Sequence, residues 1–371
     1  MSGVTTQDAP IRLAIIGCGW IAGVHADAAR KNGSRMKIVA CADKNVEAAR
    51  AFAAKHGCDN AYDSIETMLS AEKLDGVIIC TWPNLHHEHI YQVMNSGIRY
   101  ILCEKALTVY AEDAREVLRR TRAAGVTVLE GFMFRYHPMY RKLKEMSRQI
   151  GPIDTIRAGF HEYDPELEDL NDTSRNWRQV KEAGGGVAYD YTCYSIHAAT
   201  DLADSLPASV SFHGEIGRYG TLVRLHGHIV YENRIVALIH SSRRANISKE
   251  VEVYAANESL ELPLAYGFTI PASVKLRRRL GNTNVTLRDE FVDMPEMAGG
   301  HDDHISARRQ LEHFADIIGG AQPHIDLAET VVNMFIIEAM VESAETKRTV
   351  EVKIPEDVRA AWLAGREPRA Q

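Results

Sequence analysis

The sequence predicts two domains: a doubly wound α/β domain with a parallel sheet, then an α+β domain with a large, mostly antiparallel, open-faced sheet. The chain has 371 residues, which is longer than a single hydrophobic core usually grows. Between residues 11 and 129, short apolar runs alternate with amphipathic helical segments, as in parallel sheets covered by helices on both faces. After Gly151-Pro152 the apolar period becomes two, which is typical of antiparallel or mixed sheets.

The first domain is expected to span residues 11–131, after a flexible tail at 1–10 that lacks the charged and apolar regions of a signal peptide. Its helices are predicted to begin near Trp20, Asn45, Asn84 and Tyr110. Gly97 and Gly125 precede strands, as glycines that terminate helices do. The predicted strands cover 11–16, 36–42, 75–80, 99–103 and 126–129.

The second domain is expected to span residues 132–371. One helix near 187–203 interrupts its strands, and two helices near 304–318 and 327–346 follow them. We expect the last helices to pack back on the first domain, and the open sheet face to be covered in a homodimer or homotetramer. The predicted strands cover 153–161, 208–216, 221–231, 234–241, 249–255 and 284–292.

Composition excludes several classes of partner. The net charge of −7 argues against nucleic-acid binding, which requires clustered basic residues. No apolar run approaches the roughly 20 residues that span a bilayer, so no membrane partner is expected. The six cysteines form no CxxC pair and fall largely in predicted strands or turns, which favours reduced thiols and a cytoplasmic location.

A glycine-punctuated turn follows the first predicted strand, where residues 17–22 read GCGWIA. Gly17 permits the tight turn, Gly19 lets the backbone approach a pyrophosphate, and Ala22 allows close packing of the helix on the strand. The positive end of the next helix is suited to bind a diphosphate. Alone this pattern is weak, since an ordinary strand–turn–helix can show it.

An acid at the end of the second strand strengthens the prediction. Asp43 lies about twenty residues beyond the glycines, where a carboxylate accepts hydrogen bonds from the ribose hydroxyls of NAD. Its charge repels a 2′-phosphate, so Asp43 favours NAD, while Lys44 beside it leaves NADP possible. The sequence therefore predicts a Rossmann domain that binds a nicotinamide dinucleotide.

A lysine follows the buried strand at 99–103. In doubly wound sheets, ligands bind beyond the carboxyl ends of the strands, so Lys105 is expected to face the nicotinamide crevice. There its ammonium could hydrogen-bond a substrate hydroxyl and lower the proton affinity of a neighbouring acid–base group. The alternative is a surface lysine paired with Glu104.

The helix near 187–203 begins after three glycines and carries three polar groups on one face. Asp190, Tyr194 and His197 are spaced i, i+4 and i+7. Together they could hold a polyhydroxylated substrate and accept a proton from an alcohol, with Lys105 lowering the pKa of Tyr194 from its ordinary value of about 10. The alternative is that Tyr194 is a core residue and Asp190 a cap.

Other polar clusters favour simpler interpretations. The histidines near Asn84 lack a further ligand at metal spacing, and the residues around His301 and His304 are expected to cap a helix, so no metal site is predicted. Trp177-Arg178 and Arg135 are candidates to line the substrate cleft, and Trp82 to stack on the cofactor, although each could instead serve packing.

Over nearly its whole length the chain resembles the glucose-fructose oxidoreductase/inositol dehydrogenase/rhizopine-catabolism (Gfo/Idh/MocA) family. Residues 83–87, PNLHH, resemble its PNxxH loop; residues 103–105, CEK, resemble its EKP motif; and residues 184–194 resemble GGGxLxDxGxH. The resemblance implies NAD- or NADP-dependent oxidation or reduction of sugars, inositols and related polyols. It implies that Lys105 is catalytic, that Asp190 orients substrate and lysine, and that Tyr194 donates or accepts the proton.

Three residues depart from the family pattern. Ala106 replaces the proline of EKP, Thr192 replaces a glycine of the helix motif, and His197 stands where inositol-type members often carry an acid. The catalytic set is thus Lys105, Tyr194 and Asp190, and the substrate set His197, Trp177, Arg178 and Arg135. The expected cofactor contacts are Gly17, Gly19, Trp20, Ile21, Asp43, Lys44, Thr81, Trp82, Asn84, His87 and Glu104.

Two other functions fit the same pattern. One is a non-catalytic regulator that binds a nucleotide or sugar, and the other is a lyase or glycosidase that works through tightly held NAD. Loss of the strand-end lysine or the helix aspartate would favour the regulator, but this chain carries both residues. Net formation of NADH would distinguish a dehydrogenase from the tight-cofactor enzyme.

Overall fold

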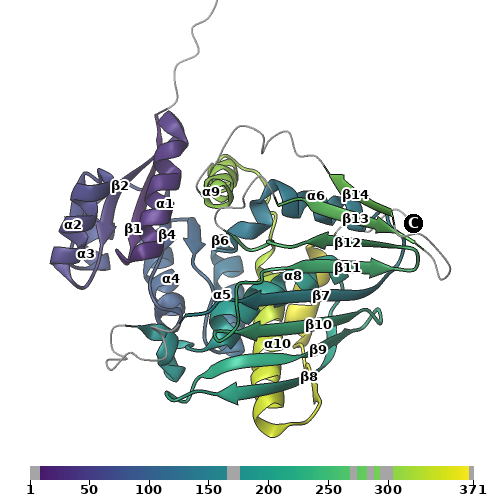
Figure 1. The fold of residues 1–371 in the computed structure, drawn as a ribbon. Helices are drawn as coiled ribbons and strands as arrows, with labels where there is room; N and C mark the ends of the chain where they lie inside the picture. The colour runs from purple at the N-terminus through teal and green to yellow at the C-terminus, as the bar shows by residue number, and fades with distance from the viewer. Residues whose placement is uncertain (1–8, 165–175, 268–273, 282–287, 293–303, 367–371) are drawn as a thin grey trace, which may run out of the picture.

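A computed structural model of the chain describes residues 9–164, 176–267, 274–281, 288–292 and 304–366. The chain builds two sheets, one near each end of the molecule, with helices between and around them (Figure 1). The predictions for residues 1–8 and 301–303, and the first part of the strand predicted at 284–292, lie outside the described residues.

The first sheet has six parallel strands in the order β3-β2-β1-β4-β5-β6. The order reverses at β1, as in doubly wound folds, so the predicted fold class is confirmed. The strands are β1 (Ile11–Ile16), β2 (Met36–Ala42), β3 (Asn60–Tyr62), β4 (Gly76–Ile79), β5 (Tyr100–Cys103) and β6 (Thr127–Glu130). The helices are α1 (Trp20–Lys31), α2 (Val46–His56), α3 (Ile65–Ala71), α4 (His86–Asn95) and α5 (Ala111–Ala124).

β3 and α3 were not predicted. β3 has only three residues, none of them buried, and lies at the sheet edge, so it lacks the apolar run that marks the other strands. α3 is seven residues long and buries only Met68, so its periodicity is weak. Ser64 caps it by accepting a hydrogen bond from the Thr67 amide.

The second sheet has nine strands in the order β14-β13-β12-β11-β7-β10-β9-β8-β15. β7 and β10 pair in parallel and the other pairs are antiparallel, which confirms the mostly antiparallel sheet. β12, β13 and β15 were not predicted. The strands are β7 (Ile153–His161), β8 (Pro207–Ile216), β9 (Leu222–Tyr231), β10 (Val236–Ser242), β11 (Val251–Ala255), β12 (Glu258–Leu262), β13 (Leu276–Leu280), β14 (Arg288–Val292) and β15 (Val350–Glu351).

Helices cover one face of this sheet and tie it to the first domain. In Figure 1, α8 (Cys193–Ala203) and α10 (Leu327–Thr346) lie behind the strands. The Ala111 amide at the start of α5 donates to Glu338 Oε1 of α10 at 2.7 Å, and Asn32 Nδ2 after α1 donates to the Arg308 carbonyl of α9 at 3.2 Å. The remaining helices are α6 (Pro138–Ser147), which was not predicted, α9 (Ile305–Ile318) and α11 (Glu356–Ala364).

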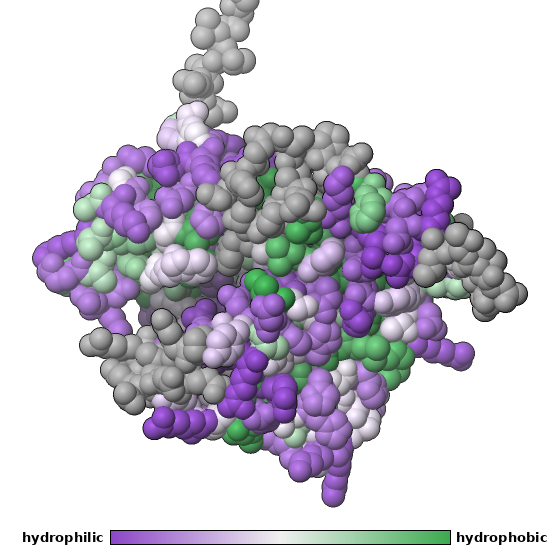
Figure 2. All heavy atoms as spheres, in the orientation of Figure 1, coloured by the Kyte–Doolittle hydropathy of each residue, from purple (hydrophilic) through white to green (hydrophobic). Residues whose placement is uncertain are grey.

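The opposite sheet face is turned toward the viewer in Figures 1 and 2. Figure 2 shows mainly hydrophilic side chains there, with scattered apolar ones. Leu238 on β10 and Tyr254 on β11 are among the exposed large apolar side chains. Within the described ranges, no helix combines the length and apolar character needed to cross a membrane.

Candidate active site

Lys105 meets Asp190 at the boundary between the two domains. Lys105 follows β5, and its Nζ donates to both Oδ1 and the main-chain carbonyl of Asp190, each at 2.9 Å. The two side chains are 10 % and 4 % exposed. Burial disfavours the charged form of the lysine, but Asp190 outweighs this effect and raises the pKa of Lys105.

Two arginines also donate hydrogen bonds to Asp190. Its Oδ2 accepts from Arg178 Nε at 2.7 Å and from Arg243 Nη2 at 3.2 Å. Burial alone would raise the pKa of Asp190, but Arg178, Lys105 and Arg243 together hold it well below the ordinary range. Asp190 therefore stays ionised, as an anion held by three cations.

The glycine run lets the Arg178 segment approach the helix that carries Asp190. A Cβ at Gly185 would lie 2.7 Å from the carbonyl oxygens of Trp177 and Val180, so only glycine fits there. The amide of Gly186 donates to the Arg178 carbonyl at 2.9 Å. The main chain of Arg178 is thus bound to Gly186, and its side chain to Asp190.

Asp190 lies in a π-helical turn, residues 188–192, that leads into α8. Thr192, which departs from the family pattern, donates its hydroxyl to the Val187 carbonyl five residues earlier at 3.0 Å. The predicted helix is present, but its first turn is wider than an α-helical turn.

Tyr194 lies beside Lys105 as predicted, but its pKa moves in the other direction. The lysine Nζ is 5.0 Å from the centroid of the tyrosine ring, and Phe132 packs edge-on at 5.2 Å. Burial raises the pKa of Tyr194, and Lys105 offsets this only in part. The expectation that the pKa of Tyr194 is lowered is therefore corrected. The ring lies in an aromatic cluster, where the phenolate is poorly solvated.

Trp177 and Arg178 join this centre, whereas His197 points elsewhere. The Trp177 ring centroid is 6.0 Å from Lys105 Nζ and 4.9 Å from Arg178 Cζ. His197 is 1 % exposed, lies 3.2 Å from Glu130 Oε2 and packs on Phe132. The expectation that His197 contacts the substrate is therefore corrected, because its side chain is enclosed in the interior between Phe132 and Glu130.

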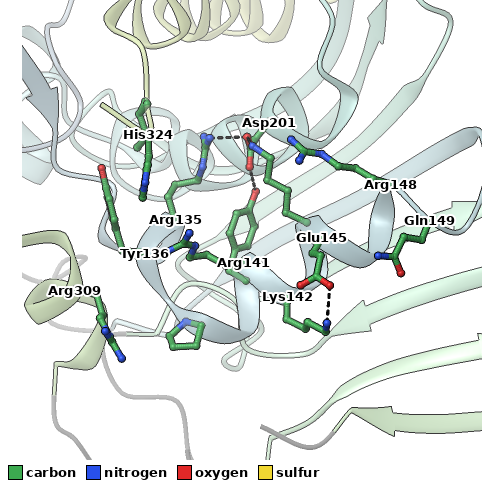
Figure 3. A pocket seen from close by; sticks show the side chains of 14 residues that line it. Arg135, Tyr136, Arg141, Lys142, Glu145, Arg148, Gln149, Asp201, Arg309 and His324 are labelled. Carbon is green, nitrogen blue, oxygen red and sulfur yellow. Dashed lines mark hydrogen bonds and ion pairs between the residues drawn. The ribbon is translucent and has the colours of Figure 1, made fainter. Parts of the chain in front are cut away.

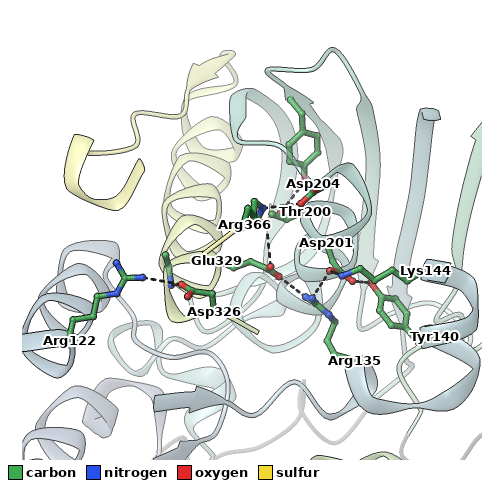
Figure 4. Close-up of polar contacts among 12 residues, drawn as sticks. Arg122, Arg135, Tyr140, Lys144, Thr200, Asp201, Asp204, Asp326, Glu329 and Arg366 are labelled. Atoms are coloured by element: carbon green, nitrogen blue, oxygen red, sulfur yellow. Dashed lines mark hydrogen bonds and ion pairs between the residues drawn. The ribbon is translucent and has the colours of Figure 1, made fainter. Parts of the chain in front are cut away.

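Arg135 belongs to a separate buried ionic cluster (Figure 4). Its Nη1 donates to Glu329 Oε1 at 2.6 Å and its Nη2 to Asp201 Oδ1 at 2.5 Å. Tyr140 donates to the other oxygen of Asp201 at 2.9 Å. The expectation that Arg135 lines the substrate cleft is corrected, because its guanidinium is committed to two buried carboxylates.

The Arg135 cluster borders an open depression of about 940 Å³ beside α6 (Figure 3). Arg141, Lys142, Arg148 and His324 are among its lining residues, and Lys105, Asp190 and Tyr194 are not. This depression is distinct from the lysine–aspartate centre.

Three polar residues hold the loop that carries Lys105. Glu104 Oε1 lies 2.8 Å from His25 Nε2 of α1, so its carboxylate is engaged within the first domain. Glu130, the last residue of β6, accepts at Oε1 from the Leu107 amide at 2.9 Å. His86 lies between two carbonyl oxygens, with Nδ1 3.0 Å from Ala106 O and Nε2 2.9 Å from Thr81 O. We assign these residues, including Glu104, a positioning role.

The predicted dinucleotide turn has the expected geometry. Gly17 has φ +87°, and a Cβ there would lie 2.9 Å from Thr81 Cγ2. Asp43 accepts from the Cys18 amide at Oδ2 and from the Asn45 amide at Oδ1, both at 2.9 Å. α1 begins at Trp20 without a side-chain cap, so its first amides can receive a diphosphate. These residues fit a nicotinamide dinucleotide.

The other predicted cofactor residues line the same edge of the sheet. Thr81 follows β4, and its Oγ1 lies 2.9 Å from His89 Nδ1. The Oδ1 atom of Asn84 is buried and has no hydrogen-bond partner in the described part of the chain. Trp20 is 68 % exposed. Gly19 and Lys44 are also exposed, whereas Ile21, Trp82 and His87 are half-buried.

Sequence reasoning missed four positioning residues: His25, His86, Glu130 and Arg243. Glu130 and Arg243 could have been found, because each ends or follows a strand directly, as Lys105 does. His25 and His86 gave no such signal, since their partners are distant in sequence or are main-chain atoms. Among the described residues, no group of three or more histidine, cysteine or acidic side chains could hold a metal ion.

Family models match both domains. Residues 11–132 match the model described as an oxidoreductase family with an NAD-binding Rossmann fold, and residues 140–261 match the GFO/IDH/MocA C-terminal domain.

Relatives cover most of the chain. It is 27 % identical to D-xylose 1-dehydrogenase (NADP(+)) 2 of Haloferax volcanii, across 86 % of this chain and 93 % of that protein. It is 25 % identical to inositol 2-dehydrogenase of Rhizobium meliloti, across 92 % and 99 %. Among solved structures, levoglucosan dehydrogenase with NADH and levoglucosan has a TM-score of 0.80 at 19 % identity, covering 93 % and 100 %. This last likeness concerns the fold alone.

Proposed function

Because the chain belongs to the Gfo/Idh/MocA family of NAD(P)-dependent oxidoreductases, we propose that Lys105, Asp190 and Tyr194 catalyse hydride transfer at a hydroxyl-bearing carbon of a sugar or cyclic polyol. The observation that carries this proposal is the Lys105–Asp190 pair beside Tyr194. Lys105 follows β5 on the same sheet edge as Gly17 and Thr81, which follow β1 and β4. The acid–base groups and the dinucleotide turn therefore share one edge.

Each residue has a distinct part in the proposed reaction. Gly17, the first turn of α1 and Asp43 would hold the dinucleotide, which when bound accepts or returns the hydride. Lys105 has hydrogen-bonding capacity beyond Asp190 and can donate to the reacting oxygen. Asp190 fixes the position of the ammonium and keeps it charged.

Tyr194 exchanges the proton with the reacting oxygen. In oxidation its phenolate receives the hydroxyl proton, and in reduction its phenol returns a proton to the forming alkoxide. Burial raises the pKa of Tyr194, so the phenol predominates near neutral pH. This arrangement favours reduction near neutrality and oxidation at alkaline pH.

Formation of reduced nicotinamide with a panel of aldoses, inositols, anhydrosugars and dihydrodiols tests the proposal. Lys105→Met serves as the inactive variant, and Lys142→Met, on α6, as a matched lysine substitution outside the site. We expect turnover in the wild type and in Lys142→Met, and its loss in Lys105→Met. Equal turnover in all three proteins would contradict the assignment.

We propose NAD as the preferred cofactor, with NADP also accepted, because both oxygens of Asp43 are fixed by main-chain amides. Held in this way, the carboxylate opposes a 2′-phosphate. We also propose that the open sheet face mediates a homodimer or homotetramer and that the enzyme is cytoplasmic. Light scattering of wild type and of Leu238→Asp would test the interface.

A further inference from the structure

We infer that the polyol substrate of this enzyme carries a negative charge, a carboxylate or a phosphate, that Arg178 recognises, with the buried Arg243 adding positive charge behind it. This inference rests on the proposed function and names the substrate class of the same site. It starts from the charge balance around Asp190.

The site holds more positive than negative charge. Lys105, Arg178 and Arg243 all contact Asp190, which is the one carboxylate within 4.0 Å of any of these cations in the described part of the chain. Three positive charges thus meet one negative charge. The side chains of Lys105 and Arg243 are only 10 % and 2 % exposed, so water screens this excess poorly.

Arg178 retains unused hydrogen-bond donors, whereas Arg243 uses Nη1 for the Arg178 carbonyl and Nη2 for Asp190 Oδ2, both at 3.2 Å. Arg243 Nε is buried and has no hydrogen-bond partner among the described residues. Arg178 uses its Nε for Asp190, its side chain is 36 % exposed, and its guanidinium lies over Trp177. A guanidinium whose terminal nitrogens remain available suits a planar carboxylate or a phosphate.

The forming alkoxide accounts for only part of this excess. One ammonium beside the reacting oxygen, that of Lys105, already supplies a cation for it. The arginines contact Oδ2 of Asp190, the oxygen that Lys105 does not use. Their charges are therefore available for a second, permanent anionic group of the substrate.

A matched substrate series tests this inference. Glucose, glucuronate and glucose 6-phosphate differ only at carbon 6, and galactose with galacturonate repeats the comparison in a second configuration. We expect kcat/KM for at least one charged member to exceed that of its neutral partner about 10- to 100-fold, the usual range for a charge-assisted hydrogen bond. The anion that gives the larger increase in kcat/KM over the neutral sugar, carboxylate or phosphate, is the one that the site prefers.

Variants of Arg178 separate recognition from a structural role. Arg178→Gln should lower the charged-to-neutral ratio of kcat/KM about tenfold or more, and Arg178→Lys should restore part of it. Arg141→Gln removes an exposed cation from the depression beside α6 and should leave the ratio unchanged. A ratio that falls equally in Arg178→Gln and Arg141→Gln would overturn the assignment of the anion to this site.

The outcomes distinguish this inference from the proposed function. Equal kcat/KM for charged and neutral members would overturn the anionic substrate and leave the dehydrogenase standing. If no compound is oxidised, calorimetric titration of the same series into the NAD-loaded enzyme tests whether the site binds an anionic sugar. Tighter binding of a charged member, lost in Arg178→Gln, supports the inference without the chemistry, whereas equal or absent binding overturns it.

Discussion

Two buried ionic clusters of this protein differ in their charge balance. Around Arg135, the cations of Arg135, Lys144 and Arg366 meet the carboxylates of Asp201, Asp204 and Glu329 (Figure 4). Around Asp190, three cations meet one carboxylate.

The charge balance distinguishes ion pairs that stabilise the fold from the site that we propose binds the substrate. The balanced cluster lies among the segment that follows β6, the helices α6, α8 and α10, and the residues that follow α11. Among the described residues, three cations meet three carboxylates in it. The unbalanced cluster retains positive charge and open donors where the two domains meet. Burial alone does not distinguish the two clusters, because each combines at least one buried carboxylate with at least one partly exposed cation. The charge count does distinguish them.

The largest expected effect is on catalysis in the unbalanced cluster. Lys105→Met removes the donor to the reacting oxygen and should lower kcat about 10²- to 10⁴-fold. Asp190 keeps Arg178 and Arg243, so the unfolding transition should stay near that of the wild type. Steady-state kinetics and urea unfolding on one preparation test both expectations. A destabilised Lys105→Met protein would mean that this lysine is structural.

The same exchange in the balanced cluster should have the opposite result. Arg135→Met leaves Asp201 and Glu329 without their shared cation, which should cost about 3–5 kcal/mol of unfolding free energy. The kcat of the folded protein should be unchanged, because Arg135 does not contact the Lys105 centre. A kcat loss as large as that of Lys105→Met would remove the distinction between the clusters.

Acid pH should sharpen the same contrast. Burial would raise the pKa of Asp201, but Arg135 and Lys144 outweigh it and lower the pKa. Its contribution to stability is therefore present above the unfolded value of about 3.9 and is lost as the pH falls through the lower folded value. Arg135→Met should unfold at a higher pH than the wild type, as circular dichroism during acid titration would show.

A smaller effect concerns the pH dependence of catalysis. Because the pKa of Tyr194 is raised, the oxidation rate should climb through the alkaline range as the phenolate forms. Tyr194→Phe should lower oxidation about 100-fold or more and abolish that climb. The pH profile of kcat/KM for both proteins is the measurement. An alkaline limb that persists in Tyr194→Phe would assign the proton transfer to another group.

The smallest effect concerns the cofactor. Asp43→Ser removes the charge that opposes a 2′-phosphate and should shift the NADP-to-NAD ratio of kcat/KM about tenfold, or ~1.4 kcal/mol. The matched exchange Asp59→Ser removes another acid of the first domain, at the surface beside Lys37, and should leave the ratio unchanged. An unchanged ratio in Asp43→Ser would show that Asp43 does not contact the ribose.

Local pattern predicted most of the fold. β1 and β2 match their predicted bounds, since a buried parallel strand is an unbroken apolar run. The short edge strand β3 and the strands β12 and β13 were missed. β13 carries Arg277, Arg278 and Arg279, which face Glu258, Glu261 and Asp289 on the neighbouring strands. These pairs were not predicted, because the acidic partners are distant in sequence from the three arginines.

The candidate site was predicted in part. Lys105, Asp190 and Tyr194 were singled out from strand-end position and helical spacing, and the fold brings them together. His197 was singled out by the same helical spacing, but it lies beside Glu130 in the interior. Arg135 was a candidate to line the substrate cleft, but it is bound by Asp201 and Glu329. Arg243 was not singled out, although it directly follows β10 and contacts Asp190.

The sequence by itself determined the parallel sheet, the dinucleotide turn and the family, because each depends on residues close together in the chain. Only the tertiary structure decided which charges meet. Lys105, Arg178, Asp190 and Arg243 come from four segments and both domains, and the pKa values of Asp190 and Tyr194 depend on that meeting and on burial. Electrostatic energy depends on distance and solvent exposure, and the folded chain sets both.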